Sequence, residues 1–446
     1  MAAARAARKL AALILAAGKG TRLNSRKPKV LHAVGGRPML DFMLDAVEAL
    51  GAERRLVVVG YGAEAVRERF ASRAEFVIQA EQRGTGHAVS LCREPLGAFE
   101  GDVVVLYGDT PLLRGETIAR MAEHRRRSGA DLVLLSAEVD VPGIVVRDGE
   151  GKIARIVEVP DATPDELAIR ERNTGVYLLD AGLLWKLLER VDDRNAQGEL
   201  YLTSIVELAV ADGCRVEGLV LSDPDEALGV NTRAELARAE ACMRERTLNR
   251  VMAAGVTIVD PASTYIDVDV EIGADTLIEP GCVIQGATRI GSGVHLKPGC
   301  MIESSRIGDD VEMGPNAHLR PNCTIGDGCR IGNFVEVKNS ALGPGVKADH
   351  LSYIGDADVG AKASFGCGSI VVNYDGQKKY RTTVGERAFI GCNVNLIAPV
   401  TIESDAFVAA GSTITSNVPS GALGVARAKQ RNVEGWVARK RPKKHD

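Results

Sequence analysis

The sequence predicts a Rossmann-like α/β domain with a mostly parallel sheet, followed by a left-handed parallel β-helix of hexapeptide repeats. Three observations predict this fold class. Strand-like apolar runs alternate with helix-length segments over the first half, a helical stretch without glycine or proline follows, and aliphatic residues then recur every six positions. We therefore expect a first domain at residues 1–233, a linker helix at 234–254, and a β-helix with a basic tail at 255–446.

The first domain is expected to consist of βαβ units. Amphipathic segments, such as residues 38–50 and 115–127, separate the runs that read as strands. These runs are residues 10–17, 56–59, 76–79, 103–107 and 132–136. Strands that alternate with helices form parallel sheets, which bind ligands beyond the carboxyl ends of their strands. The loops after these runs are therefore the places to look for a site.

Composition excludes several classes of protein. Of the 446 residues, 45% are apolar and 26% are charged, as in globular domains, which rules out a disordered or fibrous chain. The net charge of −4 argues against a nucleic-acid partner, although basic residues gather after residue 426. No apolar run reaches the ~18 residues that a membrane span needs, so no span is expected.

The amino terminus resembles a short signal peptide, because basic residues precede the apolar run at residues 10–18. That run leads directly into a glycine-rich loop, and we interpret it as a buried first strand. The nine cysteines are not clustered, which predicts a reduced, cytoplasmic setting.

The second half of the chain carries the hexapeptide repeat, which holds one phase over long stretches. The repeat positions are Ile272, Ile278, Ile284, Ile290, Leu296, Ile302, Ile307, Met313, Leu319, Ile325, Ile331, Val337, Val359, Phe365, Val371, Val384, Ile390, Leu396, Ile402, Val408 and Ile414. This period is typical of a parallel β-helix, whose short strands each bury one such side chain. Before it, residues 232–254 are rich in helix formers and predict one long helix.

Four of the cysteines follow the same repeat. Cys282, Cys300, Cys323 and Cys329 each lie four residues after a repeat position. Neighbouring repeats place valine or alanine in that slot, so we expect these cysteines to be small buried side chains. Their spacing does not match that of zinc ligands.

Two glycine-rich loops follow predicted strands of the first domain. In LAAGKGTRL, residues 15–23, Gly18 and Gly20 allow backbone N–H groups to approach phosphate oxygens, and nearby lysine and arginine side chains supply positive charge. Its spacing matches neither the dinucleotide fingerprint nor a Walker loop. The second loop is QAEQRGTGHA, residues 79–88. Either loop alone is more often a plain turn.

Polar residues follow the later strands as well. Asp109 comes directly after the run 103–107 and puts a carboxylate where a magnesium–triphosphate could bind. Glu158, Asn173 and Asn231 also follow strand-like stretches. Taken singly, each is more often a cap or a turn residue.

Together and in this order, these loops and polar residues resemble the sugar-1-phosphate nucleotidyltransferases. With the hexapeptide repeats behind them, nearly the whole chain resembles the bifunctional N-acetylglucosamine-1-phosphate uridylyltransferase/glucosamine-1-phosphate acetyltransferases. The resemblance implies a cytoplasmic homotrimer with Mg²⁺ as cofactor. It would acetylate glucosamine-1-phosphate with acetyl-CoA, and then transfer uridylyl from UTP to N-acetylglucosamine-1-phosphate.

The resemblance implies a nucleotide and sugar site in the first domain. The residues assigned to it are Leu15, Ala16, Ala17, Gly18, Arg22, Lys29, Gln79, Gly84, Thr85, Tyr107, Gly108, Asp109, Gly143, Glu158, Asn173 and Asn231. Arg22 and Lys29 would neutralise phosphates, whereas Asp109 and Asn231 would bind Mg²⁺. The chain departs from the family in a shorter loop at residues 140–144, and in lacking a lysine that usually follows Glu158.

The resemblance implies a second site in the β-helix, where a loop at residues 373–383 interrupts the repeat. His350 would be the general base that takes a proton from the attacking glucosamine amine. The sugar phosphate would contact Arg320, Lys338, Tyr353, Ser364, Asn373, Tyr374 and Lys379, and acetyl-CoA would contact Cys367, Cys392, Ala410 and Arg427. The backbone N–H of Cys367 would donate to the thioester oxyanion.

Three positions of this second site depart from the family. Ser364 stands where asparagine is usual, Cys367 where alanine is usual, and Cys392 where serine is usual. Two other interpretations stay open. The chain could be a single-activity nucleotidyltransferase for another sugar phosphate with the β-helix as an oligomerising platform, or a catalytically silent scaffold. Separate assays of the two reactions distinguish them.

Overall fold

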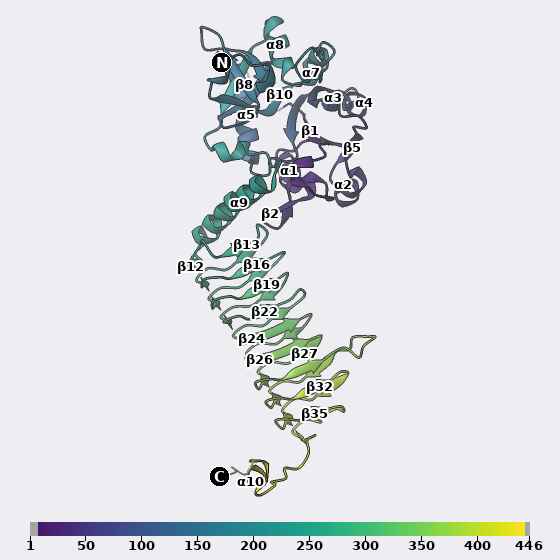
Figure 1. Ribbon diagram of the computed structural model, residues 1–446, viewed down its shortest axis with the longest axis vertical. Helices are drawn as coiled ribbons and strands as arrows, with labels where there is room; N and C mark the ends of the chain where they lie inside the picture. The colour runs from purple at the N-terminus through teal and green to yellow at the C-terminus, as the bar shows by residue number, and fades with distance from the viewer. Residues whose placement is uncertain (1–7, 442–446) are drawn as a thin grey trace, which may run out of the picture. The chain divides into compact units, whose positions relative to one another are not determined.

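The computed structural model describes residues 8–441 and divides into two compact units, Met1–Arg244 and Glu245–Asp446 (Figure 1). The division falls inside helix α9 (Arg233–Ala253), which confirms the long helix that the sequence predicts. No helix in the described part of the chain is long and apolar enough to cross a membrane.

The first unit is built on a nine-stranded sheet with the order β11-β7-β10-β6-β1-β4-β5, and the β8–β9 hairpin joins at β10. The strands are β1 (Leu10–Ala16), β4 (Arg54–Val59), β5 (Glu75–Ile78), β6 (Asp102–Tyr107), β7 (Leu132–Glu138), β8 (Gly143–Arg147), β9 (Ile153–Glu158), β10 (Glu171–Asp180) and β11 (Val216–Val220). Pairings β1–β4, β1–β6, β4–β5 and β7–β11 are parallel. The antiparallel pairs all involve β10 or the hairpin, so the mostly parallel sheet is confirmed.

Both faces of this sheet are covered. On β1, Ile14 belongs to one buried apolar cluster and Leu13 to the other, which is why the strand reads as a continuous apolar run. The helices of this unit are α1 (Met39–Ala49), α2 (Ala63–Phe70), α3 (Thr85–Ser90), α4 (Arg93–Leu96), α5 (Gly115–Ser128), α6 (Pro164–Leu167), α7 (Ala181–Leu188) and α8 (Ser204–Ala211). A small pair, β2 (Ala33–Val34) and β3 (Arg37–Pro38), precedes α1.

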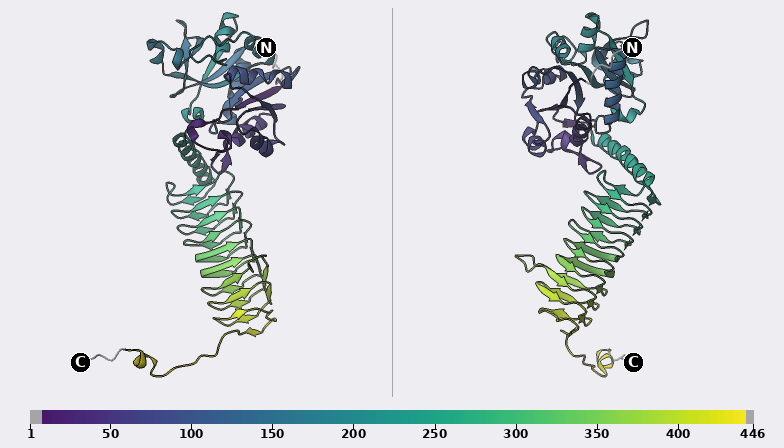
Figure 2. Two further views of the ribbon diagram at one scale, coloured as in Figure 1. Left: turned by 45° about the vertical axis from the view of Figure 1, so that its right-hand side comes forward. Right: turned by 180° about the vertical axis from the view of Figure 1, so that it is seen from behind.

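The second unit is a parallel β-helix with a seventeen-stranded and an eight-stranded sheet (Figures 1 and 2). The larger sheet contains β12 (Thr257–Ile258), β13 (Tyr265–Ile266), β15 (Leu277–Ile278), β16 (Val283–Gln285), β18 (His295–Leu296), β19 (Met301–Glu303), β21 (Glu312–Met313), β22 (His318–Leu319), β24 (Arg330–Lys338), β26 (Lys347–Gly355), β28 (Ser364–Phe365), β29 (Ile370–Val372), β31 (Phe389–Ile390), β32 (Asn395–Ile397), β34 (Phe407–Val408), β35 (Thr413–Ile414) and β36 (Leu423–Gly424). The smaller contains β14 (Glu271–Ile272), β17 (Arg289–Ile290), β20 (Arg306–Ile307), β23 (Thr324–Ile325), β25 (Ala341–Leu342), β27 (Ala357–Val359), β30 (Thr382–Val384) and β33 (Val400–Ile402). A short helix, α10 (Trp436–Lys440), lies in the tail.

The hexapeptide prediction is confirmed residue by residue. Every predicted repeat position is buried in one continuous core, except Ile272, which packs against that core while partly exposed. Cys282, Cys300, Cys323 and Cys329 are buried in the same core and are free thiols, as their slot predicts. One coil is longer than the others, because residues 373–381 project from the stack between β29 and β30 (Figure 1, yellow-green).

The repeat makes a stability prediction at β23, where Ile325 is buried and its neighbour Thr324 is exposed. Ile325→Ala is expected to lower the free energy of unfolding of the β-helix by about 2–5 kcal/mol, because it leaves a cavity in the core. Thr324→Ala is the matched control and should change it by less than about 0.5 kcal/mol. Hydrogen exchange of the coil amides in denaturant measures both, and equal effects would contradict the inward assignment of the repeat.

Candidate functional site

A cavity of about 1170 Å³ lies at the carboxyl ends of β1, β5 and β6 in the first unit. All of the residues that the sequence assigns to the nucleotide and sugar site line this cavity, except Gly108. They come from segments as distant as the first glycine loop and the start of α9. The parallel sheet therefore gathers the predicted group in one place.

Gly108 does not line the cavity. It is buried behind the cavity wall, where an added Cβ would lie 3.3 Å from the Cβ of Ala16 and 3.2 Å from Val30 Cγ1. A larger side chain at this position would press on the glycine loop, so Gly108 has a packing role, and its expected place among the binding residues stays a prediction.

Three glycines at the cavity differ in how much space surrounds their α-carbons. At Gly84 the φ angle is +105°, and a Cβ would lie 2.6 Å from the carbonyl oxygen of Leu200. At Gly175 a Cβ would lie 2.1 Å from the ring of Tyr107. Both positions need glycine for the fold itself. Around Gly18, in contrast, a Cβ would meet nothing within 4 Å, so the backbone there faces open space that a ligand can fill.

The side-chain oxygens of Asp109 and Asn231 converge on one point beside the first glycine loop. The ammonium group of Lys29 lies at this point, paired with the Asp109 carboxylate and 2.9 Å from Oδ1 of Asn231. Asp109 follows β6, and Asn231 immediately precedes the first turn of α9. This arrangement offers two oxygen ligands and one mobile cation to an incoming phosphate group.

The opposite side of the cavity holds partly buried ionisable groups. Burial raises the pKa of the Glu158 carboxyl, and the nearby Asp161 adds to this, although the hydroxyl of Thr203 donates to Glu158 Oε1 at 3.1 Å and acts in the other direction. Burial likewise raises the pKa of Tyr107, with a contribution from the charge of Glu158. These groups suit hydrogen bonding to a neutral polyhydroxylic ligand.

Hydrogen bonds to Tyr177 and Gly175 position the side chain of Asn173. Its Nδ2 donates to the hydroxyl of Tyr177 at 2.6 Å, and its Oδ1 accepts from the N–H of Gly175 at 3.2 Å. Tyr177 is fully buried, and burial raises its pKa well above the ordinary value. The orientation of the Asn173 amide is therefore fixed by the core of the domain.

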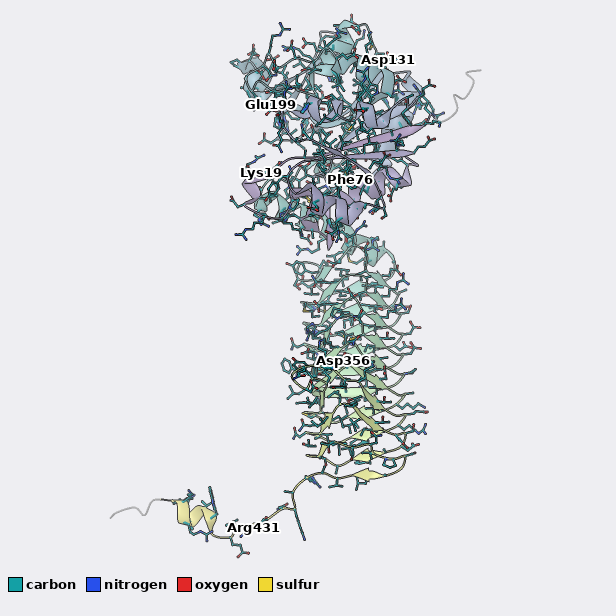
Figure 3. All side chains as sticks on the ribbon, turned by 90° about the vertical axis from the view of Figure 1, so that its right-hand side faces the viewer. Lys19, Phe76, Asp131, Glu199, Asp356 and Arg431 are labelled. Atoms are coloured by element: carbon teal, nitrogen blue, oxygen red, sulfur yellow. The ribbon has the colours of Figure 1, made fainter. Side chains whose placement is uncertain are left out.

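Several cavity residues were not predicted from the sequence. Gln82, whose Nε2 donates to the carbonyl of Ala17 at 2.8 Å, ties the two glycine loops together. Tyr201 lines the cavity with a buried hydroxyl that has no partner in the described structure, and burial raises its pKa to about 12. Glu199 also lines the cavity, whereas Lys19 lies over the ring of Tyr61 (both labelled in Figure 3). The polar residues within 195–203 are the sequence signal that could have identified this part of the cavity lining.

In the second unit, three predicted phosphate-binding cations lie close together. Arg320 follows β22 and is in register with Lys338 at the end of β24, while Lys379 extends from the projecting loop. Contact with Lys379, together with desolvation and the charge of Arg320, lowers the pKa of Lys338. Neighbouring positive charge and desolvation each lower the pKa of a lysine, and a bound anion would relieve the first of these. Glu336 partly balances the group already, because its carboxylate lies 3.1 Å from Arg320.

Asp356, which was not predicted from the sequence, holds the side chains of Asn339 and Asn373 beside this group (Asp356 is labelled in Figure 3). It is 5% exposed, and its carboxylate accepts from the side-chain amides of Asn339, at 2.5 Å, and Asn373. Asn373 Nδ2 also lies 3.4 Å from the hydroxyl of Tyr353. Tyr374 instead stays exposed on the projecting loop, where it bonds to Gly376.

His350 belongs to a column of residues on successive coils, which are exposed from His350 onward. Asn333 pairs with His350, and continuing the register of neighbouring strands leads to Cys367, Cys392 and Ala410. Arg427 donates to the carbonyl of Ala410 at 2.8 Å. Ser364 is adjacent to this column, in register with Lys347 and Phe389. The expected base and the expected acetyl-CoA residues thus share one edge of the β-helix.

Comparison with known proteins matches both units. Residues 12–199 match the MobA-like NTP transferase domain, and residues 269–304, 304–339 and 381–416 match the bacterial transferase hexapeptide family. Three curated relatives, each named bifunctional protein GlmU, align almost end to end. They are from Pelobacter propionicus (46% identity, 97% of this chain and 99% of the relative), Geobacillus thermodenitrificans (48%, 97% and 98%) and an Exiguobacterium species (47%, 96% and 99%).

The chain belongs to the GlmU family. Membership of the GlmU family confirms the fold class, an NTP transferase domain followed by a left-handed β-helix of hexapeptide repeats. It also makes the chain a transferase with two activities, and each unit contains one of the two charged groups predicted to bind phosphate.

The contact between Thr203 and Glu158 can be tested by titration. Thr203→Val is expected to raise the pKa of Glu158 further, because it removes a hydrogen bond that favours the charged carboxylate. Thr203→Ser keeps the hydroxyl and is the control. A carboxyl whose folded pKa lies above its unfolded pKa binds more protons when folded, so Thr203→Val should also steepen the loss of stability as the pH rises through that range. Carbon-detected NMR of the glutamate carboxyls measures the shift, and an unchanged pKa would disprove the contact.

Proposed function

We propose that this chain makes UDP-N-acetylglucosamine in two steps, acetyl transfer to glucosamine-1-phosphate in the second unit and uridylyl transfer to N-acetylglucosamine-1-phosphate in the first. The observation that carries the proposal is the pair of separate phosphate-binding groups. One contains Lys29, Asp109 and Asn231, and the other contains Arg320, Lys338 and Lys379. Membership of the GlmU family supports both activities.

In uridylyl transfer, a phosphate oxygen of the sugar phosphate attacks the α-phosphorus of UTP, and the bond to the departing pyrophosphate breaks. This chemistry needs positioning and charge neutralisation more than a protein nucleophile. Gly18 leaves space for the nucleotide against the backbone, and Arg22 and Lys29 supply positive charge to its phosphates. Glu158 and Asn173 would orient the sugar from the opposite wall.

Asp109 and Asn231 fit a magnesium ion. Their oxygens already converge on a cation, the Lys29 ammonium, and Mg²⁺ is usually held by one or two protein oxygens together with substrate phosphates and water. In the described residues no group of three or more acidic, histidine or cysteine side chains could hold a metal by itself, which agrees with a site completed by substrate. When bound, Mg²⁺ would add charge stabilisation for the pyrophosphate leaving group.

In acetyl transfer, the amine of glucosamine-1-phosphate attacks the thioester carbonyl carbon, and the C–S bond to coenzyme A breaks. His350 would accept the amine proton, and coenzyme A leaves as the thiol. The cations Arg320, Lys338 and Lys379 would hold the sugar phosphate. In the described chain the backbone N–H of Cys367 has no hydrogen-bond partner, so it is free to donate to the oxyanion.

We further propose which part of the chain carries each reaction, and that the protein works in the cytoplasm. Residues 1–233 would carry uridylyl transfer, residues 255–446 acetyl transfer, and residues 234–254 would link them. Tyr353, Ser364, Asn373 and Tyr374 would contact the sugar, while Cys392, Ala410 and Arg427 would contact coenzyme A. The free cysteines support a reduced cytoplasmic setting.

We also propose that the β-helix assembles as a homotrimer. An exposed apolar strip follows successive coils in register. The ring centroids of Phe389 and Phe407 are 4.3 Å apart, and Leu423 occupies the same position on the next coil. These side chains are 37%, 47% and 61% exposed. Exposed aromatic strips of this kind are typical of interfaces, and the partner proposed here is a further copy of this chain.

The two-site assignment predicts separable variants. His350→Ala should lower acetyl transfer by about 10²–10⁴-fold, because it removes the general base, and should spare uridylyl transfer. Asp109→Ala should do the reverse. Both are measured on purified protein, with acetyl-CoA and glucosamine-1-phosphate in one assay and UTP, Mg²⁺ and N-acetylglucosamine-1-phosphate in the other.

Matched controls are His318→Ala in the β-helix and Glu53→Ala at the surface of the first unit; both should retain both activities. A folded single variant that loses both reactions would contradict the assignment. A wild-type protein that transfers uridylyl but no acetyl group would favour the single-activity interpretation.

The apolar strip predicts the behaviour of a charge variant. Phe407→Asp should convert the assembly to monomers, because it places three carboxylates in an apolar interface, and should also reduce acetyl transfer if that site is shared between subunits. Thr324→Asp, on the eight-stranded sheet, is the control and should leave the mass unchanged. Light scattering after gel filtration gives the mass, and a trimeric Phe407→Asp protein would disprove this interface.

A further inference from the structure

Two exposed cysteines occupy equivalent places on consecutive coils. Cys367 lies two residues after Phe365 of β28, and Cys392 lies two residues after Ile390 of β31; Phe365 and Ile390 are paired in register. The N–H of Asn393 donates to the carbonyl of Cys367 at 2.8 Å, so the two backbones are in direct contact at this level. The two side chains therefore start from neighbouring positions on the same edge.

The local backbone gives the two side chains the same direction. Each cysteine is followed by a residue with a positive φ angle, Gly368 at +75° and Asn393 at +53°, so both occupy the same position of the same kind of turn. Neighbouring strands are about 4.8 Å apart. That spacing lies within the range of about 4.4–6.8 Å between Cα atoms that a disulfide can bridge. Two side chains with the same direction start about as far apart at Cβ, so closing the bond requires them to tilt together to the roughly 3.5–4.5 Å between Cβ atoms that a disulfide needs.

Exposure distinguishes this pair from the other stacked cysteines. Cys282 and Cys300 also lie on consecutive coils in register, and their thiols interact, but both are completely buried. Cys367 and Cys392 are exposed free thiols. The chain thus contains two stacked pairs with similar spacing, of which only this one is open to reagents.

We propose that Cys367 and Cys392 form a dithiol modification site that low-molecular-weight disulfides oxidise to an intrachain disulfide. One cysteine thiolate attacks the disulfide reagent, forms a mixed disulfide and releases one thiol. The second cysteine then attacks the protein sulfur of the mixed disulfide and releases the other thiol. The two cysteines lose two protons and two electrons, and the reagent gains them as two thiols.

The site has a consequence for acetyl transfer, and this part rests on the proposed function. The column that holds the two cysteines also holds His350, and Cys367 carries the unpartnered backbone N–H. A disulfide across this edge would occupy the place where the thioester must lie. Oxidation therefore switches off acetyl transfer and leaves uridylyl transfer, in the other unit, untouched.

The test uses the full chain and oxidised glutathione. After incubation, free thiols are alkylated under denaturing conditions, and a tryptic digest is analysed by mass spectrometry. The expected result is one crosslink between the peptides that contain Cys367 and Cys392, with alkylated Cys282 and Cys300 as the internal control. Non-reducing electrophoresis should show no covalent dimer.

Variants that lack one of the two cysteines test whether the crosslink needs both thiols. Cys367→Ser and Cys392→Ser should each abolish the crosslink and leave one glutathione adduct on the remaining cysteine. If the wild type shows two separate adducts, an interchain bond or no reaction at all, the dithiol site is disproved.

Activity is measured on the same samples. Wild-type acetyl transfer should fall in proportion to the crosslinked fraction and return with dithiothreitol, while uridylyl transfer stays constant. A crosslinked protein with full acetyl transfer would overturn the switch. Absence of acetyl transfer in the reduced protein would instead overturn the proposed function, and the crosslink itself would still be scored by mass.

Discussion

Parallel strand pairing is the constraint on which both units depend. In the first unit, β1 pairs in parallel with β4 and β6, so residues after each strand meet at one edge of the sheet. Gly18, Gln79 and Asp109 reach the same cavity for this reason. In the second unit, in-register coils stack residues that are distant in sequence into columns, such as Asn333 beside His350. Parallel pairing therefore gathers residues around a cavity in the first unit and along one edge of the β-helix in the second.

The two groups that are predicted to bind phosphate differ in their charge balance. Beside the first glycine loop, the positive charge of Lys29 is neutralised by Asp109, so the group is stable without a ligand. In the β-helix, Lys338 contacts Lys379 with Arg320 close by, and its pKa is lowered as a result. Like charges held together cost free energy, which an anion offsets when it binds. The buried Asp356, with its amide partners, limits that cost.

Sequence periodicity predicted the β-helix well, because each repeat buries one side chain at a fixed interval. The same regularity identified Cys282 and Cys300 as core residues. It could not find Asp356, because a buried carboxylate breaks the pattern and depends on the amide of Asn373, which lies on the following coil. The packing role of Gly108 was missed for a different reason. A motif places it beside Asp109, but only tertiary packing shows that its α-carbon faces Ala16 and Val30.

The cavity wall shows the same limit. Glu158 and Asn173 were found as polar residues after strands, whereas Tyr201 and Thr203 lie just before α8 and reach the cavity only through the fold. Sequence reasoning finds residues whose position follows from the end of a strand. It misses residues that reach the site from a segment other than the loop after a strand.

The shorter loop at residues 140–144 illustrates what positions a residue in this fold. Gly143 begins β8 and pairs directly with Glu158 at the end of β9, and the hairpin is anchored to β10 through the pair Ile144–Arg172. A Cβ on Gly143 would lie 3.2 Å from that of Asn173. The hairpin register therefore brings Gly143 to the part of the cavity lined by Glu158 and Asn173, whatever the length of the loop before it. A loss of residues from that loop changes the rim of the cavity, while the contact between Gly143, Glu158 and Asn173 is retained by the sheet.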